Sequence, residues 1–254
     1  MVIKKLKKLI LKYTPKKIKD FFGVEAVKVL KREQKFALLS YSQEGEDLIL
    51  QRNFGDKKIG FYIDVGAHHP KRFSNTYLFY KKGWRGINID AMPGSMIAFK
   101  AERSEDTNLE MGVSITPGEL PYYMFNEPAL NTFSPIEAKK KDGLGNYKIV
   151  ATKTIATYPL KDIFDKHLDK NQSIDFMSID VEGLDLDVLK SNDWEAYRPR
   201  FILVEDLKKQ SLSDFFTESE LYTYLGALNY EFIAKTFNTL FFKDKDKDKD
   251  KEKE

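Results

Sequence analysis

Residues 60–91 form the stretch that constrains the fold of this chain most strongly. Two short apolar runs rich in β-formers, Phe61–Val65 and residues 87–89, stand near its two ends. We expect both to be strands that are buried on both faces of a sheet. The residues between them predict a helix that Ser74 or Asn75 caps. Parallel strands need a crossover of this length, which is almost always right-handed, so the stretch predicts a βαβ unit.

Acidic side chains lie at the ends of the predicted buried strands. Asp64 comes near the end of the first strand, and Asp90 follows the second. A third buried run, residues 174–181, contains Asp180 near its end, and Glu182 follows in the next turn. Ligands of open α/β sheets bind outside the carboxyl ends of the strands. These four carboxylates are therefore candidates for ligand binding.

The rest of the chain alternates predicted strands with predicted helices, which is typical of a three-layer α/β sandwich with a mainly parallel sheet. The polar stretch 126–146 is long for a connection, and such loops often act as lids or binding loops. Pro121 favours an edge position for its strand, and Thr217 with Glu220 predicts a capping box. We expect helices at 41–54, 93–100, 159–168, 184–189 and 217–228, strands at 108–113, 119–125, 147–157, 174–181 and 201–204, and a closing hairpin at 232–237 and 239–242.

Charge divides the sequence into three parts. Residues 1–38 carry a net charge of +9, whereas the Lys/Asp/Glu tail 243–254 is neutral and has no apolar residue. The body between them, residues 39–242, carries a net charge of −6. We expect a basic helical N-terminal segment, one folded domain over 39–242 and a disordered tail. The acidic body is a poor match for a nucleic-acid-binding surface, so nucleic acid is not an expected partner.

Residues 1–23 have the pattern of a short amphipathic helix, with lysines opposite an apolar stripe. Such a helix can lie on an anionic membrane surface, or it can dock its apolar stripe on the domain. No run in the sequence approaches the ~20 apolar residues of a membrane span. Cysteine is absent, which fits a reducing compartment. We expect a cytoplasmic protein that contacts the inner membrane surface peripherally through this helix.

The turn after the first strand indicates which ligand the sheet binds. It has one glycine, Gly66, followed by His68 and His69, and it lacks the GxGxxG pattern that suits a dinucleotide pyrophosphate. Asp64 would repel a phosphate but attract a cation. Asp90 is suited to accept hydrogen bonds from both hydroxyls of a ribose. An adenosine ligand with a positive centre and no phosphate fits these residues, and S-adenosylmethionine is that ligand.

Four segments of the sequence resemble those of the FkbM family of S-adenosylmethionine-dependent methyltransferases. They are YSQEGEDLIL at 41–50, the whole of 60–91, SIDVEGLDLDVLKSNDW at 178–194 and PRFILVE at 199–205. The resemblance covers residues 41–242. It implies a class I methyltransferase fold, with a Rossmann-like sheet whose last strand is antiparallel. It also implies methyl transfer to oxygen on small molecules or sugars.

The resemblance further implies roles for individual residues in binding the cofactor and in catalysis. The implied cofactor contacts are Asp64 and Gly66 on the methionine side, Asp90 at the ribose, and Gly112, Val113 and Ser114 near the adenine, while Asp180 and Glu182 would face the reaction centre.

The base that removes the acceptor proton is open at this point. The family more often has Asn–Asp where this chain has His68 and His69. Either histidine could be the base, or both could shape the turn or bind substrate. Asp180, Glu182 and Glu205 could instead bind a divalent cation that orients two substrate hydroxyls. The polar candidates for substrate contacts are Asn75, Thr76, Asn131 and Thr132.

These observations predict an S-adenosylmethionine-dependent O-methyltransferase whose partner is a small-molecule or glycan acceptor, most simply a sugar or glycoconjugate hydroxyl. Two alternatives stay open. One is a nicotinamide-dependent oxidoreductase on the same kind of sheet, against which the missing GxGxxG argues. The other is a membrane-associated binding protein that keeps the fold without activity, against which the intact acids argue.

Overall fold

The computed structural model describes residues 35–169, 171–208 and 211–249. The described residues from Ser40 onward belong to one compact unit. The expected amphipathic helix at 1–23 lies outside the described residues, so its membrane contact stays a prediction. Among the helices that are described, none has both the length and the apolar character of a bilayer span.

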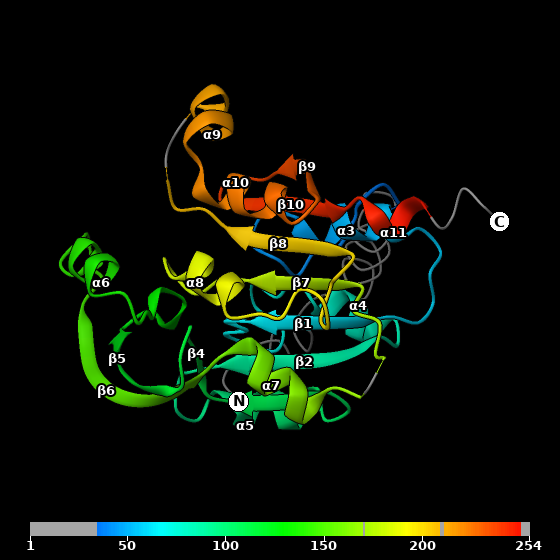
Figure 1. Ribbon diagram of the computed structural model, residues 1–254. Helices are drawn as coiled ribbons and strands as arrows, with labels where there is room; N and C mark the ends of the chain where they lie inside the picture. The colour runs from blue at the N-terminus through cyan, green and yellow to red at the C-terminus, as the bar shows by residue number, and fades with distance from the viewer. Residues whose placement is uncertain (1–34, 170, 209–210, 250–254) are drawn as a thin grey trace, which may run out of the picture. The chain divides into compact units, whose positions relative to one another are not determined.

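A seven-stranded sheet with the order β3-β2-β1-β7-β8-β10-β9 forms the centre of the unit (Figure 1). Five neighbouring strands are parallel, and β10 runs antiparallel to both β8 and β9. This confirms the mainly parallel Rossmann-like sheet with a closing antiparallel hairpin. The strands are β1 (Phe61–Val65), β2 (Arg85–Asp90), β3 (Thr107–Glu110), β7 (Phe176–Ile179), β8 (Phe201–Glu205), β9 (Tyr230–Lys235) and β10 (Thr239–Asp244).

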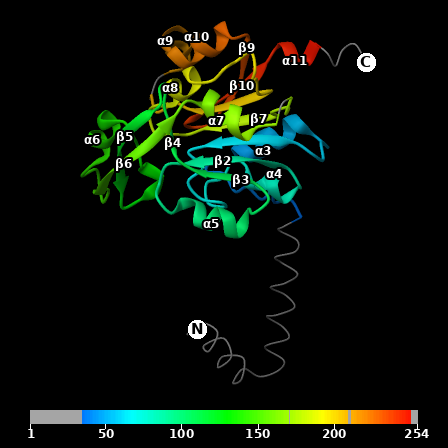
Figure 2. The same cartoon turned by 60° about the horizontal axis from the view of Figure 1, so that its bottom comes forward.

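Apolar side chains cover both faces of this sheet. Successive residues of a strand point to opposite faces, and in β8 Ile202 and Val204 join one core cluster whereas Phe201 and Leu203 join the other. Helices α3 (Glu46–Phe54) and α4 (Tyr77–Lys81) pack on the second cluster, and α7 (Leu160–His167), α8 (Asp185–Lys190) and α10 (Glu220–Ala227) pack on the first. Helix α5 (Ser95–Glu102) packs along β3, at the end of the sheet away from the β9–β10 hairpin (Figure 2). The three expected layers are therefore present.

A second, three-stranded sheet lies beyond the carboxyl ends of β1, β7 and β8 (Figure 1). It consists of β4 (Gly112–Val113), β6 (Ile149–Tyr158) and β5 (Gly118–Phe125), and β5 is at its edge, as Pro121 predicted. The long polar stretch supplies a 3₁₀ turn, η1 (Pro128–Leu130), and helix α6 (Pro135–Lys141). Both belong to this smaller layer, which faces the carboxyl edge of the main sheet.

The strand expected at 108–113 is two strands in two different sheets, β3 and β4. The change occurs at Met111, whose N–H still donates to the Asp90 carbonyl at 3.0 Å. Gly112 then passes so close to the next layer that a Cβ there would lie 2.6 Å from the Phe133 ring. The apolar pattern runs on without a break through this change, so the sequence alone did not indicate it.

The helix expected between β1 and β2 is shorter than predicted, because α4 begins only at Tyr77. His68 and Phe73 have φ of 53° and 56°, in the left-handed region that a right-handed helix excludes. The N-cap residue is Thr76, whose side chain forms no capping hydrogen bond, so the cap expected at Ser74 or Asn75 is misplaced. The Ser74 hydroxyl still accepts a hydrogen bond from the Tyr77 N–H at 3.0 Å. Residues 66–76 therefore form a structured loop at the carboxyl edge of the sheet.

The predicted capping box at Thr217 is wrong. One helix was expected over 217–228, but the chain forms α9 (Leu212–Glu218) and α10 with a break at Ser219. The Ser219 hydroxyl accepts from the Tyr222 N–H at 3.2 Å and is the cap of α10. Thr217 lies inside α9 and donates its hydroxyl to the preceding turn.

The fold extends past the boundary expected at residue 242. Lys243 and Asp244 belong to β10, and a short helix, α11 (Asp246–Lys249), follows. The Asp244 carboxylate is buried and accepts from Nε and Nη2 of Arg198 at 2.7 and 3.0 Å. This bidentate pair fixes the start of the tail. Residues 250–254 lie outside the described part of the chain.

Candidate active site

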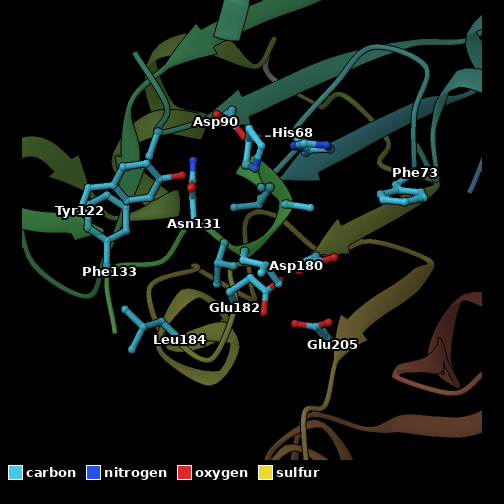
Figure 3. A pocket seen from close by; sticks show the side chains of 18 of the residues that line it. His68, Phe73, Asp90, Tyr122, Asn131, Phe133, Asp180, Glu182, Leu184 and Glu205 are labelled. Atoms are coloured by element: carbon cyan, nitrogen blue, oxygen red, sulfur yellow. Dashed lines mark hydrogen bonds between the residues drawn. The ribbon is translucent and has the colours of Figure 1, made fainter. Parts of the chain in front are cut away.

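A cavity of about 380 Å³ lies between the carboxyl edge of the main sheet and the smaller layer (Figure 3). The ends of β1, β2, β7 and β8 supply Gly66, Asp90, Asp180 and Glu205 to its wall. The opposite wall comes from β4, β5 and the stretch 126–146. The volume falls in the ~300–1,000 Å³ range of small-molecule sites. Three of the four predicted strand-end acids, Asp90, Asp180 and Glu182, therefore meet in one cavity.

Asp90 ends β2 and lies in the cavity wall, only 7% exposed. Its two oxygens accept hydrogen bonds from the backbone N–H groups of His68 and Met92, at 2.9 and 2.8 Å. Burial raises the pKa of this carboxyl, and the two N–H donors oppose that rise. Each carboxylate oxygen can accept more than one hydrogen bond, so Asp90 can still accept from two ligand hydroxyls.

Gly66 forms the turn after β1 and touches the end of β7. Its φ is 80°, and a Cβ there would lie 1.7 Å from the Asp180 carbonyl oxygen. Only glycine combines that backbone conformation with so close an approach. The turn therefore lies against the β7 end and leaves its backbone open to the cavity.

Gly112 and Val113 line the cavity where the chain enters β4. The aromatic rings of Phe133 and Tyr122 lie beside them, with their centroids 4.6 Å apart (Figure 3). This part of the wall is apolar and suits a flat heterocycle. Ser114 turns away, since its hydroxyl donates to the Thr116 carbonyl at 2.6 Å and lies 2.9 Å from the Thr157 hydroxyl. The structure thus does not place Ser114 in the expected adenine wall.

Asp64 does not line the cavity, contrary to the expected contact with the methionine side. Its carboxylate accepts from the Thr76 hydroxyl at 2.7 Å, and Arg103 donates to that hydroxyl at 2.9 Å. Asp64 and Thr76 are both buried, and burial raises the pKa of Asp64 to about 6. The two side chains hold the 66–76 loop onto the sheet, so Thr76 is not placed to contact a substrate either.

The two histidines occupy different positions. His68 lines the cavity, where burial and then the neighbouring Arg72 lower its pKa to about 4. Its Nε2 is 3.2 Å from the Arg72 guanidinium, which is always a donor. His69 is exposed outside the cavity wall, and its Nδ1 accepts from the N–H groups of Lys71 and Arg72, both at 3.0 Å. His69 therefore shapes the turn, and His68 is a weaker base than an ordinary histidine.

Three carboxylates converge at the other end of the cavity. Oxygens of Asp180, Glu182 and Glu205 all lie within 4.8 Å of one another. Asp180 is open to the cavity but is otherwise surrounded by protein. Burial, and then the charges of the neighbouring acids, raise the pKa of Asp180 and of Glu205 well above the usual range. Burial also raises the pKa of Glu182, although its ion pair with Lys141 opposes that rise.

The remaining predicted substrate residues differ in whether they line the cavity. Asn131 lines the cavity while its Oδ1 accepts from the Phe125 N–H at 2.7 Å. Thr132 is buried and donates to the Glu182 carbonyl at 2.8 Å, which ties the long stretch to the β7 turn. Asn75 donates to the Ser178 hydroxyl at 2.9 Å and borders a small recess beside Asp180 and Glu205. Of the four, Asn131 alone lines the main cavity.

Several cavity residues were not predicted from the sequence. Lys141 comes from the end of α6, and Tyr122 and Phe133 come from the smaller layer. Arg72 forms a bidentate pair with Glu127, at 2.8 and 3.0 Å, which joins the 66–76 loop to the stretch 126–146 across the cavity. The unusual length of that stretch was the one signal in the sequence that pointed to this wall.

Comparison with known proteins identifies one protein family whose sequence pattern matches most of the chain. The family described as Methyltransferase FkbM domain matches residues 64–232. A crystal structure of the methyltransferase FkbM from Methylobacillus flagellatus KT is 13% identical, with a TM-score of 0.49, and the match covers 80% of this chain and 48% of that one. The chain thus spans about half the length of that protein. No curated protein sequence matches the chain.

Proposed function

The chain belongs to the FkbM methyltransferase family, and we propose that it transfers the methyl group of S-adenosylmethionine to a hydroxyl oxygen of a sugar or glycoconjugate. The observation that carries the proposal is the composition of the cavity. One wall offers a buried strand-end acid and an apolar slot, and the far end holds three carboxylates. A methyl donor and a polar acceptor could be bound side by side in such a cavity.

The cavity residues fit S-adenosylmethionine. Asp90 would accept from the two ribose hydroxyls, and the slot beside Gly112 and Phe133 would take the adenine. The Gly66 turn, whose backbone is open to the cavity, would lie along the methionine part. Bound S-adenosylmethionine would supply a methyl group on a positively charged sulfur, which a carboxylate-rich cavity favours.

Methyl transfer requires the acceptor oxygen to lose a proton as its bond to the methyl carbon forms. The electron pair of the broken carbon–sulfur bond stays on sulfur, and the proton passes to a base of the protein. The raised pKa of Asp180 and of Glu205 makes their carboxylates better bases than ordinary ones. His68, with a pKa of about 4, is the poorer base in the same cavity.

A sugar acceptor is supported by polar groups and an aromatic ring in the cavity wall. Asn131 and Lys141 can form hydrogen bonds with hydroxyls. Phe73 and Tyr147 line the cavity and are each 40% exposed. The Arg72 guanidinium lies over one face of Phe73, 4.2 Å from the ring centroid, so Tyr147 is the ring more available to the C–H face of a sugar. We also propose that residues 1–38, with a net charge of +9, hold the enzyme at an anionic membrane surface.

Two experiments test these proposals. Labelled S-adenosylmethionine is incubated with the protein and a panel of sugars, glycolipids and non-sugar phenols. Transfer to sugars supports the acceptor class, whereas transfer confined to the phenols contradicts it. Flotation with anionic liposomes compares the full chain with a variant lacking residues 1–38. Equal flotation of the two would contradict the membrane contact.

A further inference from the structure

The acidic end of the cavity brings together carboxylates from three places in the chain. Asp180 follows β7, Glu182 lies in the next turn with φ of 57°, and Glu205 ends the neighbouring strand β8. Figure 3 shows the three side chains grouped at this end of the cavity. Three carboxylates this close cannot all be ionised without a positive charge among them.

Among the described residues, a lysine or arginine forms an ion pair with only one of these three carboxylates. Lys141 forms an ion pair with Glu182. Among the described residues, no lysine or arginine forms an ion pair with Asp180 or Glu205. The nearby acid Asp185 has its own partners, since it accepts from the N–H groups of Val181 and Gly183, both at 3.1 Å.

Glu205 gives a second, independent indication that a ligand belongs here. It is only 9% exposed, and its Oε2 is buried with no hydrogen-bond partner among the described residues. Buried polar oxygens are nearly always paired. A polar recess of about 20 Å³ lies against Glu205 and Asp180 on the side away from Glu182, where Glu44 and Glu46 also line it, and a space of ~10–15 Å³ is enough for one water-sized particle.

We propose that Asp180, Glu182 and Glu205 form a binding site for one hard divalent cation of the Mg²⁺, Mn²⁺ or Ca²⁺ class. Carboxylate oxygens are the ligands that such cations prefer. Two ligands of one ion lie at most about 4.2 Å apart for Mg²⁺ and about 4.6–5.2 Å apart for Ca²⁺, twice the metal–oxygen distance. The limit of 4.8 Å among the three carboxylates lies within the Ca²⁺ range and exceeds the Mg²⁺ maximum, so Mg²⁺ would need the three side chains to move closer together. Binding requires Lys141 to leave Glu182.

The cation also restricts the methyl acceptor to molecules that have two neighbouring oxygens. This restriction rests on the proposed function. Coordination positions that the protein leaves free face the cavity and can be taken by two neighbouring oxygens of the acceptor. A vicinal diol, as in a sugar ring, supplies such a pair. The cation lowers the pKa of a bound hydroxyl and also that of its carboxylate ligands, so with the cation bound the proton passes to water in the cavity.

The direct test is a titration of the purified full chain with Mn²⁺, followed by electron paramagnetic resonance, without cofactor or acceptor. We expect one Mn²⁺ per chain, displaced by Mg²⁺ or Ca²⁺. Glu205→Gln should weaken Mn²⁺ binding at least tenfold. Glu119→Gln is the matched control, because Glu119 is an exposed acid of β5 outside the cavity, and it should bind like wild type. Absence of Mn²⁺ binding to wild type up to millimolar concentration would overturn the site.

A second variant keeps the test decisive if Glu205→Gln fails to fold. Lys141→Met removes the ammonium group that competes for Glu182, so we expect it to tighten Mn²⁺ binding several-fold. An affinity unchanged in Lys141→Met would contradict the proposed competition and the site. Titration of the same samples with S-adenosylhomocysteine separates the two proposals. Binding of S-adenosylhomocysteine without Mn²⁺ binding refutes the cation site alone, and the reverse pattern refutes the cofactor assignment alone.

Discussion

Replacing Asp90 tests how the cavity binds its cofactor. Each Asp90 oxygen already accepts one backbone N–H, from His68 or Met92, and has capacity for one ribose hydroxyl. A hydrogen bond to a charged group contributes about 1.5–3 kcal/mol. Asp90→Ala removes two of them from the complex, so we expect a loss of about 3 kcal/mol or more, which is at least ~10²-fold in affinity.

The assay is equilibrium dialysis with labelled S-adenosylmethionine, performed on wild type, Asp90→Ala, Asp90→Asn and Glu110→Gln. Asp90→Asn retains one acceptor oxygen and should give an intermediate loss. Glu110 is an exposed acid at the end of the adjacent strand β3, so its variant controls for charge alone. Asp90→Ala also leaves two backbone N–H groups unpaired, so thermal unfolding must first show that it is folded. Affinity of a folded Asp90→Ala within threefold of wild type would refute the ribose assignment.

Two further predictions concern Asp64 and His68. Burial raises the pKa of Asp64 from 3.8 to about 6, so the folded protein favours the protonated carboxyl. The contribution of this protonated carboxyl to the free energy of unfolding is fully present below about pH 4. It is lost as the pH rises through 6, where the buried carboxyl ionises. Asp64→Asn should therefore have the same free energy of unfolding as wild type near pH 4 and be more stable by up to ~3 kcal/mol above pH 7. Denaturant titrations measure this difference between the variant and wild type, and a difference that does not vary with pH would contradict the prediction. His68 has a pKa of about 4 and is neutral through the physiological range, so His68→Gln should lose less than ~10-fold in methyl transfer and keep the wild-type pH profile. A loss in the ~10²–10⁴ range of a general base would restore His68 to that role.

The parts of the fold that the sequence predicted well are those with strong local signals. Apolar runs bounded by turns indicated β1, β2, β7 and β8, and their parallel arrangement followed from the crossovers between them. The same logic predicted that Asp90 and Asp180 would meet, because parallel strands end at the same edge. The split between β3 and β4 was not visible, since it depends on the close approach of Gly112 to Phe133, which are distant in sequence.

The errors at the site have a common physical origin. Asp64 is a strand-end acid like Asp90, but its side chain bonds to Thr76 and holds the loop, apart from the cavity. Two adjacent histidines looked equivalent, yet only His68 reaches the cavity wall. Lys141 could not be found, because it lies about 40 residues before its partner Glu182 and joins it only through the tertiary fold. Strand-end position predicts which edge a side chain lies on, and the packing of loops decides what it contacts.

One measurement tests the functional assignment most directly, which is calorimetric titration of the full chain with S-adenosylhomocysteine and, in parallel, with NAD. We expect micromolar binding of S-adenosylhomocysteine, because Asp90, the apolar slot beside Gly112 and the Gly66 turn form one cavity without a pyrophosphate-binding glycine pattern. We expect no binding of NAD. Binding of NAD without S-adenosylhomocysteine, or of neither ligand, would contradict the assignment of this cavity to a methyl donor.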